Sequence, residues 1–218
     1  MFVLTIDQQD SRTSDDAVPG VLAVLEPIDT VIPFARTIGD EVQGVLDDPA
    51  AVVEAVRRIA VASGWHIGLG VGDVEQPLPT ATTEARGQAF YAARQAVESA
   101  KSAPAHLVVR NDSESAERES TERTLAEAAL RLLVTTLGEL RTHSRGYVDH
   151  RLDHPDATQA EIAALFGVSQ QAVSRVLAPG TAEIVAGAQN LAAHHLGQLD
   201  RSMRADRPSQ AEGGAHVD

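Results

Sequence analysis

The stretch TQAEIAALFGVSQQAVSRVL, residues 158–177, carries the most specific pattern in the chain. Thr158, followed three residues later by Glu161, matches the capping box that begins an α-helix. Gly167 suits a tight turn that needs positive φ, and Ser169 is placed to cap a second helix. Apolar residues recur at helical spacing on both sides of this turn. The stretch therefore predicts a helix-turn-helix, two short helices that cross steeply over a tight turn.

The two predicted helices turn apolar residues inward and polar residues outward. The inward set is Ile162, Ala163, Leu165, Phe166, Ala172, Val173, Val176 and Leu177. The outward set is Ser169, Gln170, Gln171, Ser174 and Arg175. Gln pairs bidentately with adenine and Arg with guanine in the major groove, so these side chains favour binding to double-stranded DNA. The alternative is an ordinary helical hairpin with a polar outer face.

Charge is unfavourable for a DNA-binding surface. The 218-residue chain has a net charge of −13, and residues 146–180 hold four acidic against two basic side chains. Because phosphate binding favours a basic surface, any positive field must come from Arg141, Arg145, Arg151 and Arg175 gathered on one side. We predict that Arg151, Thr158 and Gln159 join the outward set as DNA contacts. The run TQAEIA, continued by FGVSQQAVS, resembles the helix-turn-helix of many bacterial regulators and the last region of sigma factors.

Composition limits the class of protein. Hydrophobic residues make up 43% of the chain and aromatic residues only 3%, so a core built from Ala, Val, Leu and Ile is expected. The absence of cysteine excludes disulfides and thiolate metal sites. No apolar run approaches the roughly 20 residues of a membrane span, and the N-terminus lacks the basic region of a signal peptide. We expect a soluble, cytoplasmic protein with no membrane partner.

Residues 1–110 alternate between strand and helix patterns. Strands are predicted at 2–6, 30–38, 42–46, 65–71 and 106–110, a helix fragment at 21–25, and helices after Pro49 and over 83–102. The glycines of HIGLGVG, residues 66–72, mark a close approach of another backbone. This order predicts an α+β domain with its helices on one face of the sheet.

Residues 111–120 are polar without apolar periodicity and are predicted to be a linker. A helical domain is predicted over 121–203, and residues 204–218 are expected to be disordered. Its first helix, 121–145, would turn inward Leu125, Ala129, Leu132, Leu133, Thr136 and Leu140. Its last helix, 181–203, carries a seam of Ile184, Ala188, Leu191, His195 and Leu199. Two interpretations of this seam stay open, a dimer face or packing against helix 121–145.

Four N-terminal runs, FVLTIDQQDSR, FARTIGDEVQGVL, WHIGLGVGDVE and GQAFYAARQAVESAK, resemble the SatD family of bacterial proteins. That family also carries a helix-turn-helix after this region, so the resemblance covers about residues 1–200. More distantly, the same runs resemble the palm domain of GGDEF-type nucleotidyl cyclases. The resemblance implies a ferredoxin-like palm followed by an all-α helix-turn-helix domain.

The cyclase resemblance also implies a candidate nucleotide or metal site. Asp7 ends the first strand, and Asp40 and Glu41 lie in a hairpin turn, where carboxylates could hold Mg²⁺ and nucleotide phosphates. Arg94 occupies the place of a phosphate-contacting Lys, and Lys101 lies two turns further on. Only one glycine precedes the acidic pair, and Asp7 lacks the DxD context of the cyclases. We therefore expect no catalysis. Two interpretations of these acidic residues stay open: they bind Mg²⁺ or a nucleotide, or they are simply exposed side chains in a solvated turn.

Together these patterns predict a dimeric, sequence-specific transcriptional regulator that needs no cofactor. Its palm would serve dimerisation or ligand sensing. The alternative is a metal-dependent nucleotide-binding protein or cyclase-like enzyme whose helical domain mediates protein contacts.

Overall fold

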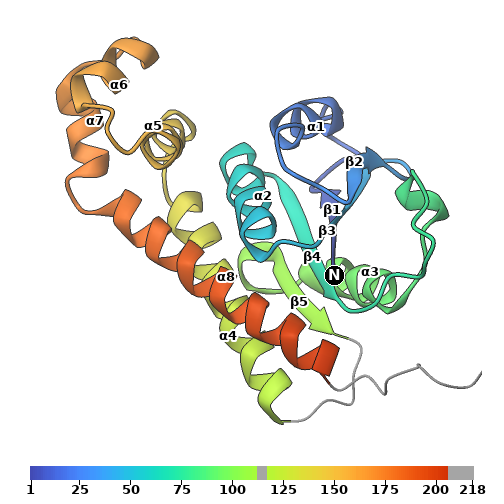
Figure 1. The fold of residues 1–218 in the computed structure, drawn as a ribbon. Coiled ribbons are helices and arrows are strands. Elements are labelled where there is room, and N and C mark those ends of the chain that lie inside the picture. The colour runs from blue at the N-terminus through green and yellow to red at the C-terminus, as the bar shows by residue number, and fades with distance from the viewer. Residues whose placement is uncertain (112–116, 206–218) are drawn as a thin grey trace, which may run out of the picture.

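The computed structural model describes residues 1–111 and 117–205. These residues form one five-stranded sheet and eight α-helices, a mixed α+β fold (Figure 1). The strands are β1 (Phe2–Gln8), β2 (Ile32–Arg36), β3 (Glu41–Leu46), β4 (Trp65–Val71) and β5 (Leu107–Asn111). The helices are α1 (Val18–Leu25), α2 (Pro49–Ala62), α3 (Gln88–Ala100), α4 (Glu117–Gly138), α5 (Thr142–Asp153), α6 (Gln159–Phe166), α7 (Gln170–Leu177) and α8 (Thr181–Ala205). None of the described helices is long and apolar enough to cross a membrane.

The sheet has the order β2-β3-β1-β4-β5. β1 pairs antiparallel with β3 and β4, and β5 joins β4 in parallel through a crossover that contains α3. Successive side chains of a strand point to opposite faces. Phe2, Leu4 and Ile6 accordingly belong to the main hydrophobic cluster, whereas Val3 belongs to a second cluster with residues of α3. β1 is therefore buried on both faces.

Helices cover both faces of the sheet, so the prediction of helices on one face was wrong. α1, α2, α4 and α8 lie on one face, and α3 lies on the other (Figure 1). A Cβ atom added at Gly70 would lie 2.0 Å from the backbone oxygen of Ala89, and one at Gly68 would lie 2.2 Å from the nitrogen of Val97. The predicted close approach at these glycines is confirmed, and the approaching backbone is that of α3.

Two predicted helices have different ends in the structure. The helix predicted over 83–102 begins at Gln88, after a 3₁₀ turn over Thr82–Glu84. The helix predicted over 121–145 stops at Gly138, and α5 begins at Thr142. Arg145 donates hydrogen bonds to the carbonyl oxygens of Leu137 (3.0 Å) and Leu140 (3.1 Å), which satisfies acceptors that the end of α4 leaves free. The break is therefore stabilised by a cation at a helix C-terminus.

The buried face of α4 also differs from the prediction. Leu125 and Leu132 are exposed, and the buried positions are Ala126, Ala129, Leu130, Leu133 and Leu137. On α8, Ala188 and Leu199 of the predicted seam are buried in the cluster that includes α4, whereas Ile184 and Leu191 are exposed. The buried residues of the α8 seam thus pack against α4 of the same chain. The face of α4 rotates because α4 must contact both β5 and α8.

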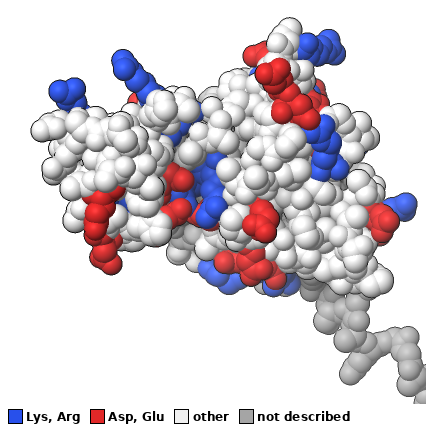
Figure 2. Space-filling view, turned by 90° about the horizontal axis from the view of Figure 1, so that it is seen from above, with Lys and Arg blue, Asp and Glu red and all other residues white. Residues whose placement is uncertain are grey.

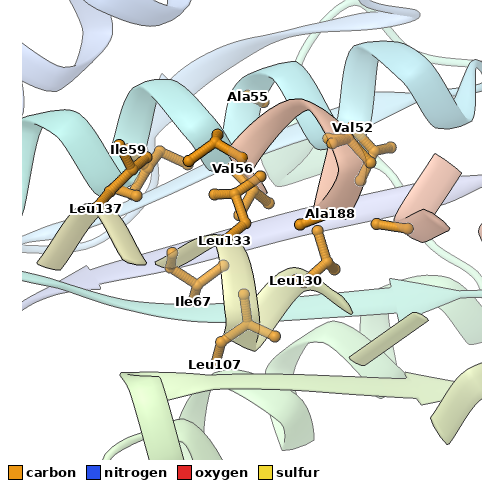
Figure 3. Packing of buried hydrophobic residues seen from close by; sticks show 14 of the residues in the cluster. Val52, Ala55, Val56, Ile59, Ile67, Leu107, Leu130, Leu133, Leu137 and Ala188 are labelled. Carbon is orange, nitrogen blue, oxygen red and sulfur yellow. The ribbon is translucent and has the colours of Figure 1, made fainter. Parts of the chain in front are cut away.

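One hydrophobic cluster joins the sheet to the later helices. Ile59 of α2, Ile67 of β4, Leu133 of α4 and Ala188 of α8 lie together in it (Figure 3). Of the predicted linker, Asn111 belongs to β5 and residues 117–120 to α4, while 112–116 lie outside the described residues. Of the predicted tail, residues 204–205 belong to α8, and the remainder lies outside the described residues.

A buried arginine connects α2 to α5. The Arg57 side chain is 1% exposed and pairs with Glu54 at 2.5 Å, Asp153 at 2.5 Å and Asp149. Burial raises the pKa of Asp149, an effect that Arg57 partly opposes. Burial acts in the same sense on Glu54, but hydrogen bonds from Arg57 and Arg58 outweigh it and lower the pKa of that carboxyl. Arg57 thus ties α5 to the helix that covers the sheet.

The two edges of the sheet are closed in different ways. On β5, the Val109 amide donates to Glu127 (2.8 Å) and the Leu107 carbonyl accepts from Arg131 (3.0 Å), both on α4. Arg131 and Glu127 also form an ion pair at 2.8 Å. On β2, Pro33 removes a backbone donor from the strand. Side chains of α4 therefore occupy the place that a sixth strand would take.

Candidate nucleic-acid interface and polar cavity

The local geometry of α6 and α7 agrees with the sequence pattern. The Thr158 side chain accepts from the Glu161 amide (3.2 Å), and Glu161 accepts from the Thr158 amide (2.7 Å), so the capping box is present. Gly167 has φ of 64° in the left-handed region, and Ser169 accepts from the Ala172 amide at 3.3 Å. Two helices of eight residues each are therefore joined over a turn of three residues.

The packing of α6 only partly follows the predicted inward set. Ile162, Ala163, Val173 and Leu177 are buried, and Ala172 and Val176 are half-buried. Leu165 is 62% exposed, so the expectation that it points inward was wrong, whereas Phe166 is 37% exposed and only partly covered. The Phe166 ring contacts the edge of Tyr147 of α5, with centroids 5.0 Å apart. α6 has neighbours on one side only, which leaves Leu165 without cover.

The polar face predicted for α7 is exposed. Ser169, Gln170, Gln171 and Arg175 are exposed, and Ser174 is half-buried. Thr158 is exposed beside them, and Gln159 is half-buried. α7 carries no acidic residue. These side chains lie on one short helix and the N-terminus of its neighbour, a compact set of hydrogen-bonding groups.

The arginines near this face are not equally available. Arg145 is engaged at the end of α4 and does not belong to a phosphate-binding set. Arg151 is half-buried, and its Nε atom is buried without a hydrogen-bond partner among the described residues. Figure 2 shows one face of the molecule, on which Lys and Arg side chains lie apart rather than in a continuous basic patch. A positive field at α7 would therefore come mainly from Arg175, which is exposed on that helix.

Three of the four acidic residues in this region have internal partners. Asp149 and Asp153 pair with Arg57, and Glu161 accepts the capping hydrogen bonds of Thr158. The backbone hydrogen bond from Thr158 holds the pKa of Glu161 below its ordinary value. A single arginine thus faces three carboxylates, and the hydrogen bonds of Glu161 leave its charge in place, so the fold compensates only part of the negative charge of this region.

A polar cavity lies on the α3 side of the sheet. Asp7 of β1 is directly opposite Glu41 of β3 in the antiparallel register. Both line a cavity of about 520 Å³ together with Arg94 of α3. An adjoining cavity of about 570 Å³ shares these three residues and adds Lys101. Four of the five residues predicted for a nucleotide or metal site are thus brought together, and Asp40 lies near enough to act on Asp7 electrostatically.

The electrostatics of the cavity centre on Asp7. Burial raises the pKa of Asp7, the nearby Lys101 opposes the rise, and Asp40 reinforces it. A hydrogen bond to Glu98 raises the pKa of Lys101. Glu41 accepts a hydrogen bond from the Thr37 hydroxyl at 2.6 Å. No group of three His, Cys, Asp or Glu residues that could hold a metal ion occurs in the described part of the chain. The predicted residues that line the cavities thus combine two carboxylates, Asp7 and Glu41, with two cations, Arg94 and Lys101.

The sequence analysis did not predict the residues that form the rest of the cavity wall. It is formed by Ile38, Thr82, Thr83, Arg86, Phe90 and Tyr91. Tyr91 is 65% exposed and Ile38 is 84% exposed, so apolar surface borders the charged end. The Thr82–Glu84 turn lies within a loop whose position over the sheet depends on long-range packing. The exposed tyrosine on an otherwise alanine-rich helix was the one local signal.

Comparisons of the chain with protein-family models, with curated proteins and with solved structures gave no match. The resemblance to the SatD family therefore stays a prediction.

Proposed function

We propose that this protein is a cytoplasmic, sequence-specific DNA-binding regulator in which α6 and α7 form a helix-turn-helix. The observation that carries the proposal is the exposed face of α7, where Gln170, Gln171 and Arg175 project beside a capped N-terminus. A face of this size and chemistry suits the major groove, which accepts one helix. The four buried residues behind it hold the two helices at a fixed angle.

The roles within the interface follow from position and chemistry. Gln170, Gln171, Ser174 and Arg175 lie along α7 and would contact base edges. Each bidentate pair with the correct base is worth about 1–3 kcal/mol of discrimination. Thr158, Gln159, Ser169 and Arg151 would contact phosphates and fix the register of α7 in the groove.

The net charge of −13 weighs against high affinity, although Asp149 and Asp153 are held in ion pairs with Arg57. With few arginines near α7, the number of phosphate contacts is small. Since each contact contributes about 0.9 to the slope of log K against log salt, we expect a shallow salt dependence.

The N-terminal part would serve as a scaffold and not as an enzyme. The order β1-α1-β2-β3-α2-β4, with α1 and α2 on one face of an antiparallel sheet, supports the ferredoxin-like palm that the family resemblance implies. A dimer built on this scaffold would present two α7 helices about 34 Å apart, matched to a palindromic operator.

The experiment is recovery and sequencing of sheared genomic DNA bound by the purified full chain, over a series of salt concentrations. Enrichment of one palindromic sequence is expected. Arg175→Ala should lose that enrichment, whereas Arg12→Ala, which changes an exposed arginine in the loop after β1, should keep it. Equal enrichment by Arg175→Ala and the wild type would refute the assignment of α7 as the recognition helix.

A second candidate function is supported by the convergence of Asp7, Glu41, Arg94 and Lys101 on one cavity. A carboxyl with a raised pKa in a concave site is a frequent mark of ligand binding. The chemistry suits a nucleotide, whose phosphates would meet Arg94 and Lys101, with or without Mg²⁺. Calorimetric titration with purine nucleotides and Mg²⁺ tests it, with Arg94→Gln as the variant expected to lose the heat and Arg12→Gln as the control.

A further inference from the structure

A further cavity lies at the β5 edge of the sheet, between α3 and α4. Its volume is about 620 Å³, and its wall contains Arg110 of β5, Arg123 and Arg131 of α4, Ser99 of α3 and Ser102 just after α3. We call it the edge cavity. It shares Ser99 and Arg110 with one of the two polar cavities described above and no residue with the other, so most of its wall is separate from them.

The positions of two arginines in β5 and α4 bring them to the edge cavity. On β5, Val108 packs with alanines of α3, and Arg110, two positions further on, lies on the same face of the strand. The Arg110 guanidinium donates to the Ser99 hydroxyl at 3.1 Å. On α4, Arg123 lies one turn before Glu127, and both side chains reach the outer edge of β5. The cavity is thus walled by one face of β5 and one side of α4.

The acidic residue in this wall already has partners. One oxygen of Glu127 accepts from the Val109 amide at 2.8 Å, and the other pairs with Arg131 at 2.8 Å. Glu98, next to Ser99 in the chain, pairs with Lys101 at 2.9 Å. Within residues 1–111 and 117–205, Arg110 and Arg123 form no ion pair. Two positive charges of the wall therefore stay unbalanced there, in a chain whose net charge is −13.

Both arginines also keep hydrogen-bond donors that the described residues do not use. A guanidinium has five N–H donors. Arg110 makes its hydrogen bond to Ser99, and Arg123 donates to the Val109 carbonyl over a long distance of 3.5 Å. Arg110 is exposed and Arg123 is half-buried, so a ligand in the cavity can reach them. The hydroxyl of Ser102 adds a further donor to the same wall.

A phosphate monoester matches this wall in charge and in hydrogen bonding. Its phosphate group carries about −1.5 to −2 charges at pH 7 and three acceptor oxygens, which balances two arginines. Arginine binds phosphate through two parallel hydrogen bonds, whereas a single carboxylate would leave one of the two cations unbalanced. The volume of about 620 Å³ lies within the range of roughly 300–1,000 Å³ for sites that hold small organic molecules. The cavity therefore has room for an organic group beside the phosphate.

We infer that the edge cavity binds a small phosphorylated molecule, whose phosphate contacts Arg110 and Arg123. The inference goes beyond the proposed function and is tested without DNA. Because Arg110 belongs to β5 and Arg123 to α4, a bound phosphate adds a contact between the sheet and the helix that packs along α8. Binding to the folded chain alone would therefore also raise its melting temperature.

Isothermal titration calorimetry of the full chain tests this inference with three probes: inorganic phosphate, glucose 6-phosphate and adenosine 5′-monophosphate. Glucose and adenosine are the neutral controls. At least one phosphorylated probe is expected to bind, and neither neutral control. Arg123→Gln should weaken that binding about 10-fold or more, because it removes a charged hydrogen-bond donor, whereas Arg12→Gln should leave it unchanged. No binding of any phosphorylated probe at millimolar concentration, or unchanged affinity in a folded Arg123→Gln variant, would overturn the inference.

A second variant leaves both arginines in place. Ser102 is exposed and lines the edge cavity but neither polar cavity beside Asp7. Ser102→Glu adds a carboxylate to the wall and should weaken binding about 10-fold, whereas Ser102→Gln, of the same size without the charge, should bind like the wild type. Arg94→Gln, which changes the polar cavities, should also keep the affinity.

Two results separate this inference from the other proposals. A phosphorylated probe that loses affinity in Arg94→Gln but not in Ser102→Glu would belong to the cavity beside Asp7, and the inference would be wrong. A chain that binds the probe in the edge cavity but enriches no DNA sequence would instead contradict the proposed function alone.

Discussion

Replacement of Arg57 by methionine tests how α5 is held to α2. Methionine keeps most of the aliphatic stem but removes the cation, which leaves Glu54, Asp149 and Asp153 facing one another. Loss of one partner from a buried ion pair costs about 3–5 kcal/mol. Here the three carboxylates are 28%, 28% and 38% exposed, so water screens part of their repulsion. We therefore expect a cost at or just below the lower end of that range, about 2–3 kcal/mol in the free energy of unfolding.

The assay is urea unfolding followed by circular dichroism, with thermal unfolding alongside. For a chain of this size, each kcal/mol corresponds to about 2–4 °C, so the melting temperature should fall by roughly 5–10 °C. The matched control is Arg58→Met on the next residue. Arg58 is 24% exposed and pairs with Glu54 at 2.7 Å, and an ion pair of that kind contributes about 1 kcal/mol or less.

The pH dependence of this difference has a defined sign. The folded pKa of Glu54 lies below its ordinary value of 4.5, so its ion pair stabilises the wild type above that pH, and this stabilisation is lost as the pH falls through the folded pKa. In Arg57→Met the three clustered carboxylates repel one another, and their protonation on acidification relieves that repulsion. The gap between wild type and Arg57→Met should therefore narrow from pH 7 to pH 4. A cost no larger than that of Arg58→Met, or a gap that widens in acid, would refute the argument.

Three further predictions concern single residues. Gly70→Ala places a methyl group 2.0 Å from a backbone oxygen of α3 and should destabilise the protein by about 3 kcal/mol or more in urea, whereas Gly20→Ala, with no atom within 4 Å, should be neutral or slightly stabilising. Glu161→Gln should speed amide hydrogen exchange in the first turn of α6 at neutral pH. Because the folded pKa of Glu161 lies below its ordinary value of 4.5, that difference should disappear only as the pH falls through the folded pKa, and a difference that persists once Glu161 is protonated would contradict the capping role. Gln171→Ala should reduce operator affinity by about 1–3 kcal/mol with discrimination lost at one base pair, while Arg175→Ala relaxes a different position; a uniform loss over all sequences would argue for phosphate contacts instead.

Local chemistry could be predicted from the sequence because its causes lie within a few residues. The capping box of Thr158 and Glu161 needs only a spacing of three, and the positive φ of Gly167 needs only the turn itself. The strands of the sheet follow from alternation and apolar runs. Such features depend little on the rest of the fold, and each is present in the structure.

The orientation of α4 could not be predicted in the same way. Its sequence offers two overlapping apolar stripes, one through Leu125 and Leu132 and another through Leu130 and Leu137. β5 and α8 together select the second stripe. The position of α3 on the second face of the sheet could not be predicted either, because it also depends on long-range packing. The glycines of β4 indicated that another backbone approaches the strand, but no local pattern identifies that backbone as α3.

In the candidate sites too, contacts between neighbouring strands could be predicted and contacts between distant parts of the chain could not. Asp7 and Glu41 could be placed near each other because a hairpin and its neighbouring strand limit the possible registers. The two partners of Arg57 on α5, Asp149 and Asp153, lie 92 and 96 positions further along the chain, and no local pattern links them to Arg57. An arginine within the apolar run VVEAVRRIA was the only sign that a charge is buried there.

The closure of the two sheet edges limits the ways in which this protein can aggregate. Side chains of α4 already satisfy the amide of Val109 and the carbonyl of Leu107, and Pro33 interrupts the opposite edge. An incoming extended segment would find few free backbone groups with which to extend the sheet. Fibrillar stacking of folded copies is thereby disfavoured, and misassembly would first require α4 to detach from β5. Glu127 and Arg131, which belong to neither the face of α7 nor the cavity beside Asp7, thus hold the exposed edge of β5 against such pairing.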